Sequence, residues 1–377
     1  MNSKINWKLP LGPEDLGIEG EIRNWKLKFN SQKFIFLLIV FFISSQVGLH
    51  FWPEFSRVSG IRIDYLSPTL YLLDTLITLW ILFFLRHPAL DAKGIWSGMT
   101  KWALSFFVAS LIWNIFAAKS NGAHIFGVAK LAEFGLFGVL VARTFTKDYI
   151  RPFILTLAAS AVLSSILSIW QFINQSSIGG LWYFLGERTF NISTIGISTV
   201  NLDQQILRSY AAFPHPNVLA FFLLMTIIFA FMRIPYEKKL AKIFLIISIL
   251  FSSLALFLTF SIILIAIAIG FFFYAIFTKS KIRAKFFGAL GLIGLLTILF
   301  FSNLVRTEFI LRGIDFRQEL LSQSFQIFLN YPYFGIGLNN FFIHQVELIK
   351  NISPILFQPP HNIFVVALLS LGLFGWW

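Results

Sequence analysis

The chain has 377 residues, of which 57% are hydrophobic and 12% charged, with a net charge of +13 and no cysteine. Soluble domains average about 45–50% apolar and about 25% charged residues, so this composition excludes an ordinary soluble protein and predicts a polytopic helical membrane protein. The absence of cysteine excludes disulfides, thiolate chemistry and cysteine-bound metals. The long apolar runs also lack the polar–apolar alternation of membrane β-barrel strands.

A polar, basic tail, residues 1–33, precedes the first apolar run. It is too long and too charged for a cleavable signal, so we predict a cytoplasmic tail and a first helix that stays as an anchor. Apolar runs then follow at roughly 34–52, 67–85, 98–118, 125–142, 152–173, 216–232, 243–277, 286–302 and 363–377.

The run 243–277 is too long for one span, because a helix rising about 1.5 Å per residue would reach roughly 50 Å across a core of roughly 30 Å. Basic clusters flank it on both sides, at 233–242 and 279–285, and both are typical of cytoplasmic loops. We therefore predict two helices with a turn near Thr259-Phe260-Ser261, which gives about ten spans.

The basic residues support this topology, since about twice as many lie in the predicted inside loops as in the outside loops. The positive charge therefore indicates loops facing anionic lipid rather than nucleic-acid binding. Two predicted outside loops are long, about 174–213 and 303–361, and long loops often carry function. The last run falls short of the roughly 20 residues of a full span. We expect one or more further helices after Trp377.

In the first long loop, Arg188 and Arg208 precede the segment Pro214-His215-Pro216-Asn217. Pro216 suits the first turn of the next helix, and His215 either sets that helix entry or belongs to a site. An arginine at this boundary favours anion binding. Snorkelling to lipid headgroups is the alternative for Arg208.

In the second long loop, apolar residues from Phe316 to Leu329 lie mostly at helical spacing and predict an amphipathic helix near the membrane surface. We expect it to stop at Asn330-Tyr331-Pro332, because proline cannot continue a helix. Arg312 and Arg317 lie about one and a half turns apart, which places one toward a cavity and the other toward solvent.

A histidine stands at the mouth of the last apolar run, in Gln358-Pro359-Pro360-His361-Asn362. Nine residues after Asn362 comes Gly372-Leu373-Phe374-Gly375. Histidine exchanges a proton near neutral pH, so His361 is a candidate acid or base at the membrane boundary.

Taken in order, these fragments resemble the O-antigen ligase and O-antigen polymerase superfamily over roughly residues 200–377. They are Arg208, Pro214–Asn217, Arg317, Pro332-Tyr333-Phe334-Gly335-Ile336-Gly337, and His361-Asn362 with its spacing to Gly372 and Gly375. The resemblance implies an all-α, multi-pass protein of the bacterial inner membrane with its active face outside the cytoplasm. It also implies N-terminal helices over 34–200, and transfer of a glycan from undecaprenyl pyrophosphate to a lipid or glycan acceptor without metal or other cofactor.

The chemistry of that transfer assigns roles to these residues. A departing pyrophosphate needs cations, a role that fits Arg208 and Arg317, with Arg188 or Arg312 in addition. The acceptor hydroxyl needs a base, a role that fits His361. His215, Asn217, Asn362, Gly335, Gly337, Gly372 and Gly375 are expected to support the site. Many members carry an arginine where this chain has Ile262, so one phosphate contact is either missing or supplied by Arg188 or Arg312.

Three other functions remain open: a repeat-unit polymerase, a lipid-linked glycan transporter and a non-catalytic envelope partner. A transporter typically shows internal repeats and polar groups at the bilayer midplane, whereas this chain shows no repeat and its candidate polar groups gather at the outer boundary. Lys130 and Glu133 lie within a span, and we interpret them as a structural i,i+3 pair. The 47 phenylalanines either line a polyprenyl groove or face lipid, the commoner case.

Overall fold

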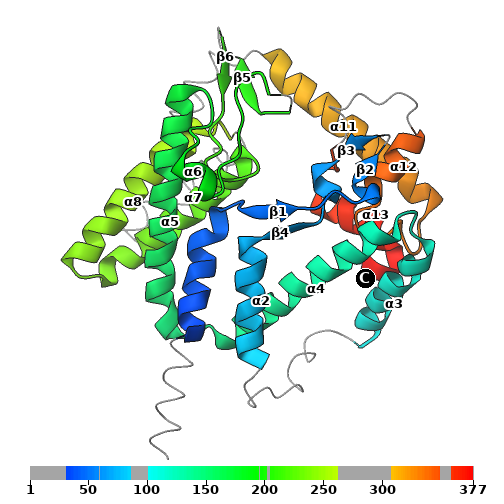
Figure 1. Cartoon of the computed structure of the whole chain (residues 1–377), viewed down its shortest axis with the longest axis horizontal. Coiled ribbons are helices and arrows are strands. Elements are labelled where there is room, and N and C mark those ends of the chain that lie inside the picture. Colours follow the sequence, from blue (N-terminus) through cyan, green and yellow to red (C-terminus); the bar gives the residue numbers. More distant parts are fainter. Residues whose placement is uncertain are drawn as a thin grey trace, which may run out of the picture.

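The computed structural model describes residues 31–58, 60–85, 101–194, 196–201, 204–261, 307–348 and 358–376 (Figure 1). These residues are mostly helical, and three short antiparallel strand pairs lie between some of the helices. The helical class is as predicted, whereas the strand pairs were not predicted.

Four described helices are long and apolar enough to cross a membrane. They are α4 (Asn121–Thr144), α5 (Lys147–Asn174), α7 (Pro216–Arg233) and α8 (Lys239–Leu258). Shorter apolar helices occupy Ser31–Ser44, α2 (Leu72–Leu85), α3 (Lys101–Ala117) and α13 (Ile363–Trp376). Each predicted run within the described residues thus contains a helix. The second half of 243–277 and the run 286–302 lie outside them.

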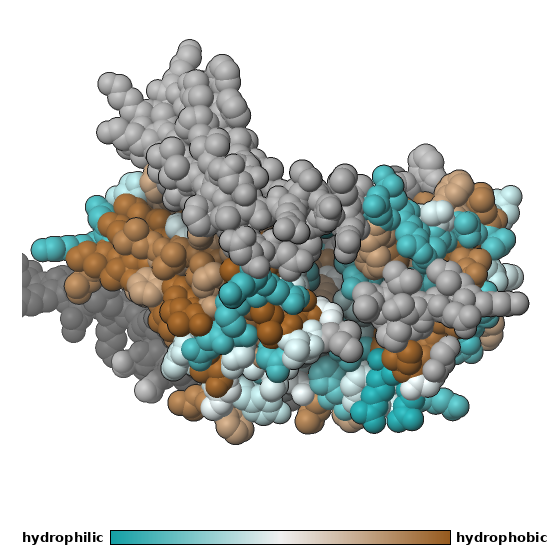
Figure 2. All heavy atoms as spheres, turned by 90° about the horizontal axis from the view of Figure 1, so that it is seen from above, coloured by the Kyte–Doolittle hydropathy of each residue, from teal (hydrophilic) through white to brown (hydrophobic). Residues whose placement is uncertain are grey.

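The largest core joins the first apolar helix, α2, α5, α7 and α8. Small residues of α5, including Ala158, Ala161 and Ser164, are buried and let neighbouring helices approach closely. Near the start of α5, at the end of the helix opposite to the first long loop, the carboxylate of Glu237 accepts hydrogen bonds from Arg151 and Arg233. Seen from above, hydrophobic residues cover much of the side where α5 and α8 lie (Figure 2).

The helix α8 ends at Leu258, and Thr259-Phe260 form a turn in which Phe260 has a positive φ of 51°. The predicted turn is therefore present, although the residues after Ser261 are outside the described part of the chain.

The second group of helices is α3, α11 (Thr307–Asn330), α12 (Phe341–Leu348) and α13. The predicted amphipathic helix over 316–329 lies within α11, which ends before Pro332 as expected. The α3 side chains Ser110 and Asn114 donate hydrogen bonds to the carbonyl of Phe334, and Ser110 also donates to Leu371. These contacts fix α13 against α3.

Gly335 and Gly372 interlock the loop before α12 with α13. Gly372 has φ 66° and interrupts α13, while Gly335 has φ 71°. The amide of Ile336 donates to the Leu369 carbonyl at 2.8 Å, and the amide of Leu373 donates to Pro332 at 2.9 Å. A Cβ on Gly372 would overlap the backbones of Tyr333 and Gly335, so both conformation and space require glycine.

Gly337 and Gly375 also have packing roles. Gly337 has φ 84°, and a Cβ there would lie 2.9 Å from the Ala118 Cβ. A Cβ on Gly375 would lie 2.9 Å from the Ser110 Cβ. Gly335, Gly372 and Gly375 thus allow the close packing of α13, and Gly337 allows close packing against Ala118, just after α3.

Three strand pairs are present: β1 (Gly48–His50) with β4 (Thr69–Tyr71), β2 (Arg57–Val58) with β3 (Ile61–Arg62), and β5 (Thr199–Asn201) with β6 (Gln205–Leu207). The second and third are hairpins of consecutive strands, and the first joins the two ends of the segment that contains the second. The third pair belongs to the first long loop, which also contains the short helix α6 (Leu181–Phe184). Figure 1 shows β5 and β6 projecting beyond the upper end of α5.

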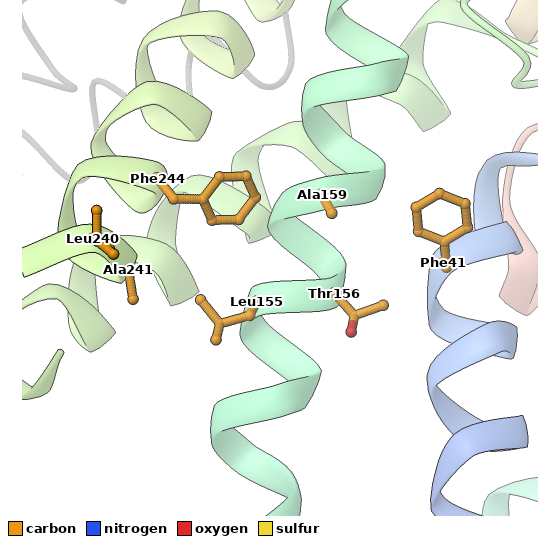
Figure 3. Close-up of a pocket in the computed structure, with 7 residues that line it drawn as sticks. All are labelled: Phe41, Leu155, Thr156, Ala159, Leu240, Ala241 and Phe244. Carbon is orange, nitrogen blue, oxygen red and sulfur yellow. The ribbon is translucent and has the colours of Figure 1, made fainter. Parts of the chain in front are cut away.

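A shallow apolar groove of about 480 Å³ lies between the first apolar helix, α5 and α8 (Figure 3). Its lining residues are Phe41, Leu155, Thr156, Ala159, Leu240, Ala241 and Phe244. None of them is a predicted site residue.

Candidate anion-binding site

Arg208 is held by three segments that converge at the end of α8 and the start of α7. Its Nε donates to the Thr259 carbonyl, its Nη1 to Ser198 Oγ and its Nη2 to Asn217 Oδ1, each at 2.8 Å. A guanidinium has five N–H groups, so two remain without a hydrogen-bond partner among the described residues. The side chain is thus fixed in place with donors to spare.

The acceptors around Arg208 are neutral. None of the ion pairs in the described part of the chain includes Arg188, Arg208 or Arg317. Burial lowers the pKa of Arg208 to about 10, so the group still carries its charge at neutral pH. A desolvated guanidinium without a carboxylate partner is suited to bind an anionic ligand.

Arg188 lies beside the same segment. Its Nη2 donates to the Pro214 carbonyl at 2.9 Å, and its guanidinium lies 5.6 Å from the centre of the Tyr210 ring. The neighbouring Glu187 carboxylate does not neutralise it. That carboxylate is buried and accepts hydrogen bonds from Gln171 Nε2 and from the amides of Ile178 and Gly179.

His215 caps α7. Its Nδ1 accepts a hydrogen bond from the Asn217 amide at 3.1 Å, and Pro216 is the first residue of the helix. The interpretation of His215 as a helix-entry residue is therefore confirmed. Burial lowers its pKa to about 4, and the positive charges of Arg208, His361, Arg188 and Arg317 act in the same direction.

These electrostatic effects show that residues of the two long loops lie near each other. His215, Arg188 and Arg208 come from the first loop, and Arg317 and His361 from the second. Arg317 is an exposed residue of α11, and its charge also acts on His361. The electrostatic effects thus connect His215 with Arg188, Arg208, Arg317 and His361, and their assembly into one catalytic site stays a prediction.

His361 lies two residues before the first residue of α13. Its Nε2 lies 3.1 Å from Gln358 Oε1, a contact that the sequence did not predict. Desolvation, and then the charge of Arg317, lower the pKa of His361 below its usual value. Although part of the side chain reaches solvent, the ring is therefore neutral near pH 7 and able to accept a proton.

Asn362 serves the helix. Its Oδ1 accepts hydrogen bonds from the amides of Phe364 and Val365, at 2.9 and 3.3 Å, and so caps α13. It positions His361 through the backbone. The side chain of Arg312 and the whole of Ile262 lie outside the described residues.

Tyr65 is a site neighbour that sequence reasoning missed. It belongs to the short 3-10 helix η4 (Asp64–Leu66), and its ring stacks on Phe342 of α12 at 5.8 Å. Burial raises the pKa of Tyr65, and the charge of Arg188 acts against that rise, which places Tyr65 near the arginine. No motif or spacing in the sequence marks this tyrosine.

Lys130 lies apart from this cluster in α4. Its Nζ lies 3.0 Å from Glu133 Oε2, so the predicted pair is present, and 2.5 Å from Asp74 Oδ2. The second partner, on α2, was not predicted. Among the described residues, no three histidine, aspartate or glutamate side chains come together as metal ligands would.

Comparisons with models of protein families, with curated proteins and with solved structures find no match for this chain.

Proposed function

We propose that the chain is a membrane glycosyltransferase of the O-antigen ligase type. It transfers a glycan from undecaprenyl pyrophosphate to an acceptor hydroxyl on the extracytoplasmic side of the bacterial inner membrane. One observation supports the proposal: the charges of Arg188, Arg208 and Arg317 all act on His215, that of Arg317 also acts on His361, and none of the three arginines forms an ion pair among the described residues.

The arginines stabilise the leaving group. Breaking the bond between the anomeric carbon and the phosphate oxygen leaves its electron pair on undecaprenyl pyrophosphate, which gains negative charge. Fixed cations that already point at the site stabilise that charge without having to reorganise. Arg208 is the best fixed of the three, because three oxygens hold its guanidinium.

His361 acts as the base for the acceptor hydroxyl. As the acceptor oxygen forms its bond to the anomeric carbon, its proton moves to the imidazole. A depressed pKa keeps His361 in the neutral, proton-accepting form near pH 7. If Nε2 donates to Gln358, Nδ1 is the nitrogen that receives the proton.

Arg188 is the residue that compensates for Ile262. Its charge acts on His215 in the same cluster, and it forms no ion pair with a carboxylate in the part of the chain that the structure describes. In this proposal it supplies the phosphate contact that isoleucine cannot make.

The test is transfer by purified protein in lipid nanodiscs, supplied with an undecaprenyl-pyrophosphate glycan and candidate acceptors. The acceptors are lipid A core and a second lipid-linked glycan, and the one that is extended distinguishes a ligase from a polymerase. Arg317→Ala should reduce transfer strongly, whereas Arg57→Ala, at an exposed arginine of β2, should not. Failure of the unmodified protein to extend either acceptor would contradict the proposal.

A further inference from the structure

The short helix α6 presents an exposed apolar surface beside the arginine cluster. Leu181 is 80% exposed, Phe184 75%, Tyr183 59% and Leu185 42%. Trp182, in the same turn, packs against the largest core. One side of α6 is therefore attached to the protein, and the other carries apolar side chains without protein cover in the described part of the chain.

This surface is held rigidly. The buried Glu187 carboxylate accepts hydrogen bonds from the amides of Ile178 and Gly179, and the Glu187 amide donates to the Trp182 carbonyl at 2.9 Å. Gly186, with φ 102°, lies against the backbone of Ser45 and Gln46. These bonds close a loop around α6, so the exposed side chains cannot fold back onto the core.

Three contacts place α6 level with the ends of apolar helices. Gly186 lies against Gln46, just after the helix Ser31–Ser44. Glu187 binds Gln171 in the last turn of α5, and Arg188 binds the Pro214 carbonyl, two residues before α7. Figure 1 likewise shows α6 beside the upper part of α5.

The exposed surface of α5 leads toward the same place. Its exposed residues Leu163, Ile166, Trp170 and Ile173 recur at helical spacing and so share one face, which ends one residue before the end of the helix. Such a face on a membrane helix contacts lipid, and α6 begins seven residues after the end of α5.

We propose that α6 is an interfacial anchor whose exposed apolar side chains insert into the outer leaflet beside α5. Apolar and aromatic residues at this depth bind the boundary between headgroups and acyl chains. Because Arg188 lies four residues after the last residue of α6, the anchor holds the arginine cluster at the level of lipid phosphates. The anchoring rests on α5 and α7 crossing the membrane, and it does not depend on glycan transfer.

The absence of cysteine makes a direct test possible. A spin label is attached to Phe184→Cys, and to Gln204→Cys as the control, an exposed polar residue just before β6. Each protein is placed in nanodiscs, and the accessibility of the label to oxygen and to a water-soluble nickel chelate is measured by electron paramagnetic resonance.

The ratio of oxygen to nickel accessibility should be several-fold higher at position 184 than at position 204. The same ratio should be found in a His361→Ala background, since the anchor is independent of the chemistry. A label at 184 as accessible to nickel as the label at 204 would overturn the proposal, and so would a label shielded from both reagents, which indicates a protein partner.

Discussion

Replacing Arg208 by lysine should be nearly as harmful as replacing it by alanine. The guanidinium donates to three oxygens from three segments, each at 2.8 Å. A lysine ammonium is a point charge that cannot reproduce this planar arrangement, so at least two contacts are lost. At about 1.5–3 kcal/mol for each charge-assisted hydrogen bond, the loss amounts to about 3–6 kcal/mol. Because these bonds lie within the protein, their loss releases the cation from its position rather than removing a bond to the substrate, and a misplaced group of this kind costs roughly 100-fold in kcat/KM.

The assay is transfer from a lipid-linked glycan by purified Arg208→Lys and Arg208→Ala proteins. Arg57→Lys is the matched control, because Arg57 is an exposed arginine that is not part of the cluster. Thermal unfolding of each variant separates loss of activity from loss of the fold. A folded Arg208→Lys protein with unmodified kcat/KM would refute the reasoning, because charge alone would then suffice.

Three further predictions concern the base, the glycines and the topology. The acidic limb of the pH dependence of kcat/KM should lie below pH 6.5, because the lowered pKa of His361 keeps its ring neutral down to a more acidic pH than usual. Arg317→Gln should move this limb to higher pH, because it removes a positive charge that lowers the pKa of His361. Gly372→Ala should lower the melting temperature, since its backbone (φ 66°, ψ −174°) lies in a region that essentially only glycine adopts and that costs other residues about 1–3 kcal/mol, whereas Gly138→Ala, in open space on α4, should not. A reporter fused after residue 285 should be cytoplasmic, and a periplasmic signal would contradict the prediction that the run 243–277 forms two helices joined by a turn.

Hydropathy predicted the helices well because it is a local property of the sequence. Runs of apolar residues predicted the helix Ser31–Ser44 and the helices α2, α3, α4, α5, α7, α8 and α13. The spacing from Phe316 to Leu329 predicted the amphipathic part of α11. The strand pairs were missed because their strands have only two or three residues, too few for a periodic pattern. Their pairing instead depends on the helices that bring the loop ends together.

The composition of the site stays a prediction, whereas the structure shows the part that several of its residues play in the fold. Motif order indicated Arg208, Arg317 and His361, and the charges of all three act on His215. The sequence did not reveal that Thr259, 51 residues after Arg208, holds its guanidinium. Nor did it reveal that Gly372 packs against Tyr333, since such contacts are set by tertiary packing rather than by neighbouring residues.

The most direct test of the central claim separates donor binding from chemistry at His361. The dissociation constant of an undecaprenyl-pyrophosphate glycan is measured for the unmodified and His361→Ala proteins in nanodiscs, together with the rate of transfer. We predict that His361→Ala binds the donor as tightly as the unmodified protein, because the arginines hold the pyrophosphate, and that it transfers no glycan. Transfer at the unmodified rate, or loss of donor binding together with transfer, would contradict the assignment of His361 as the base.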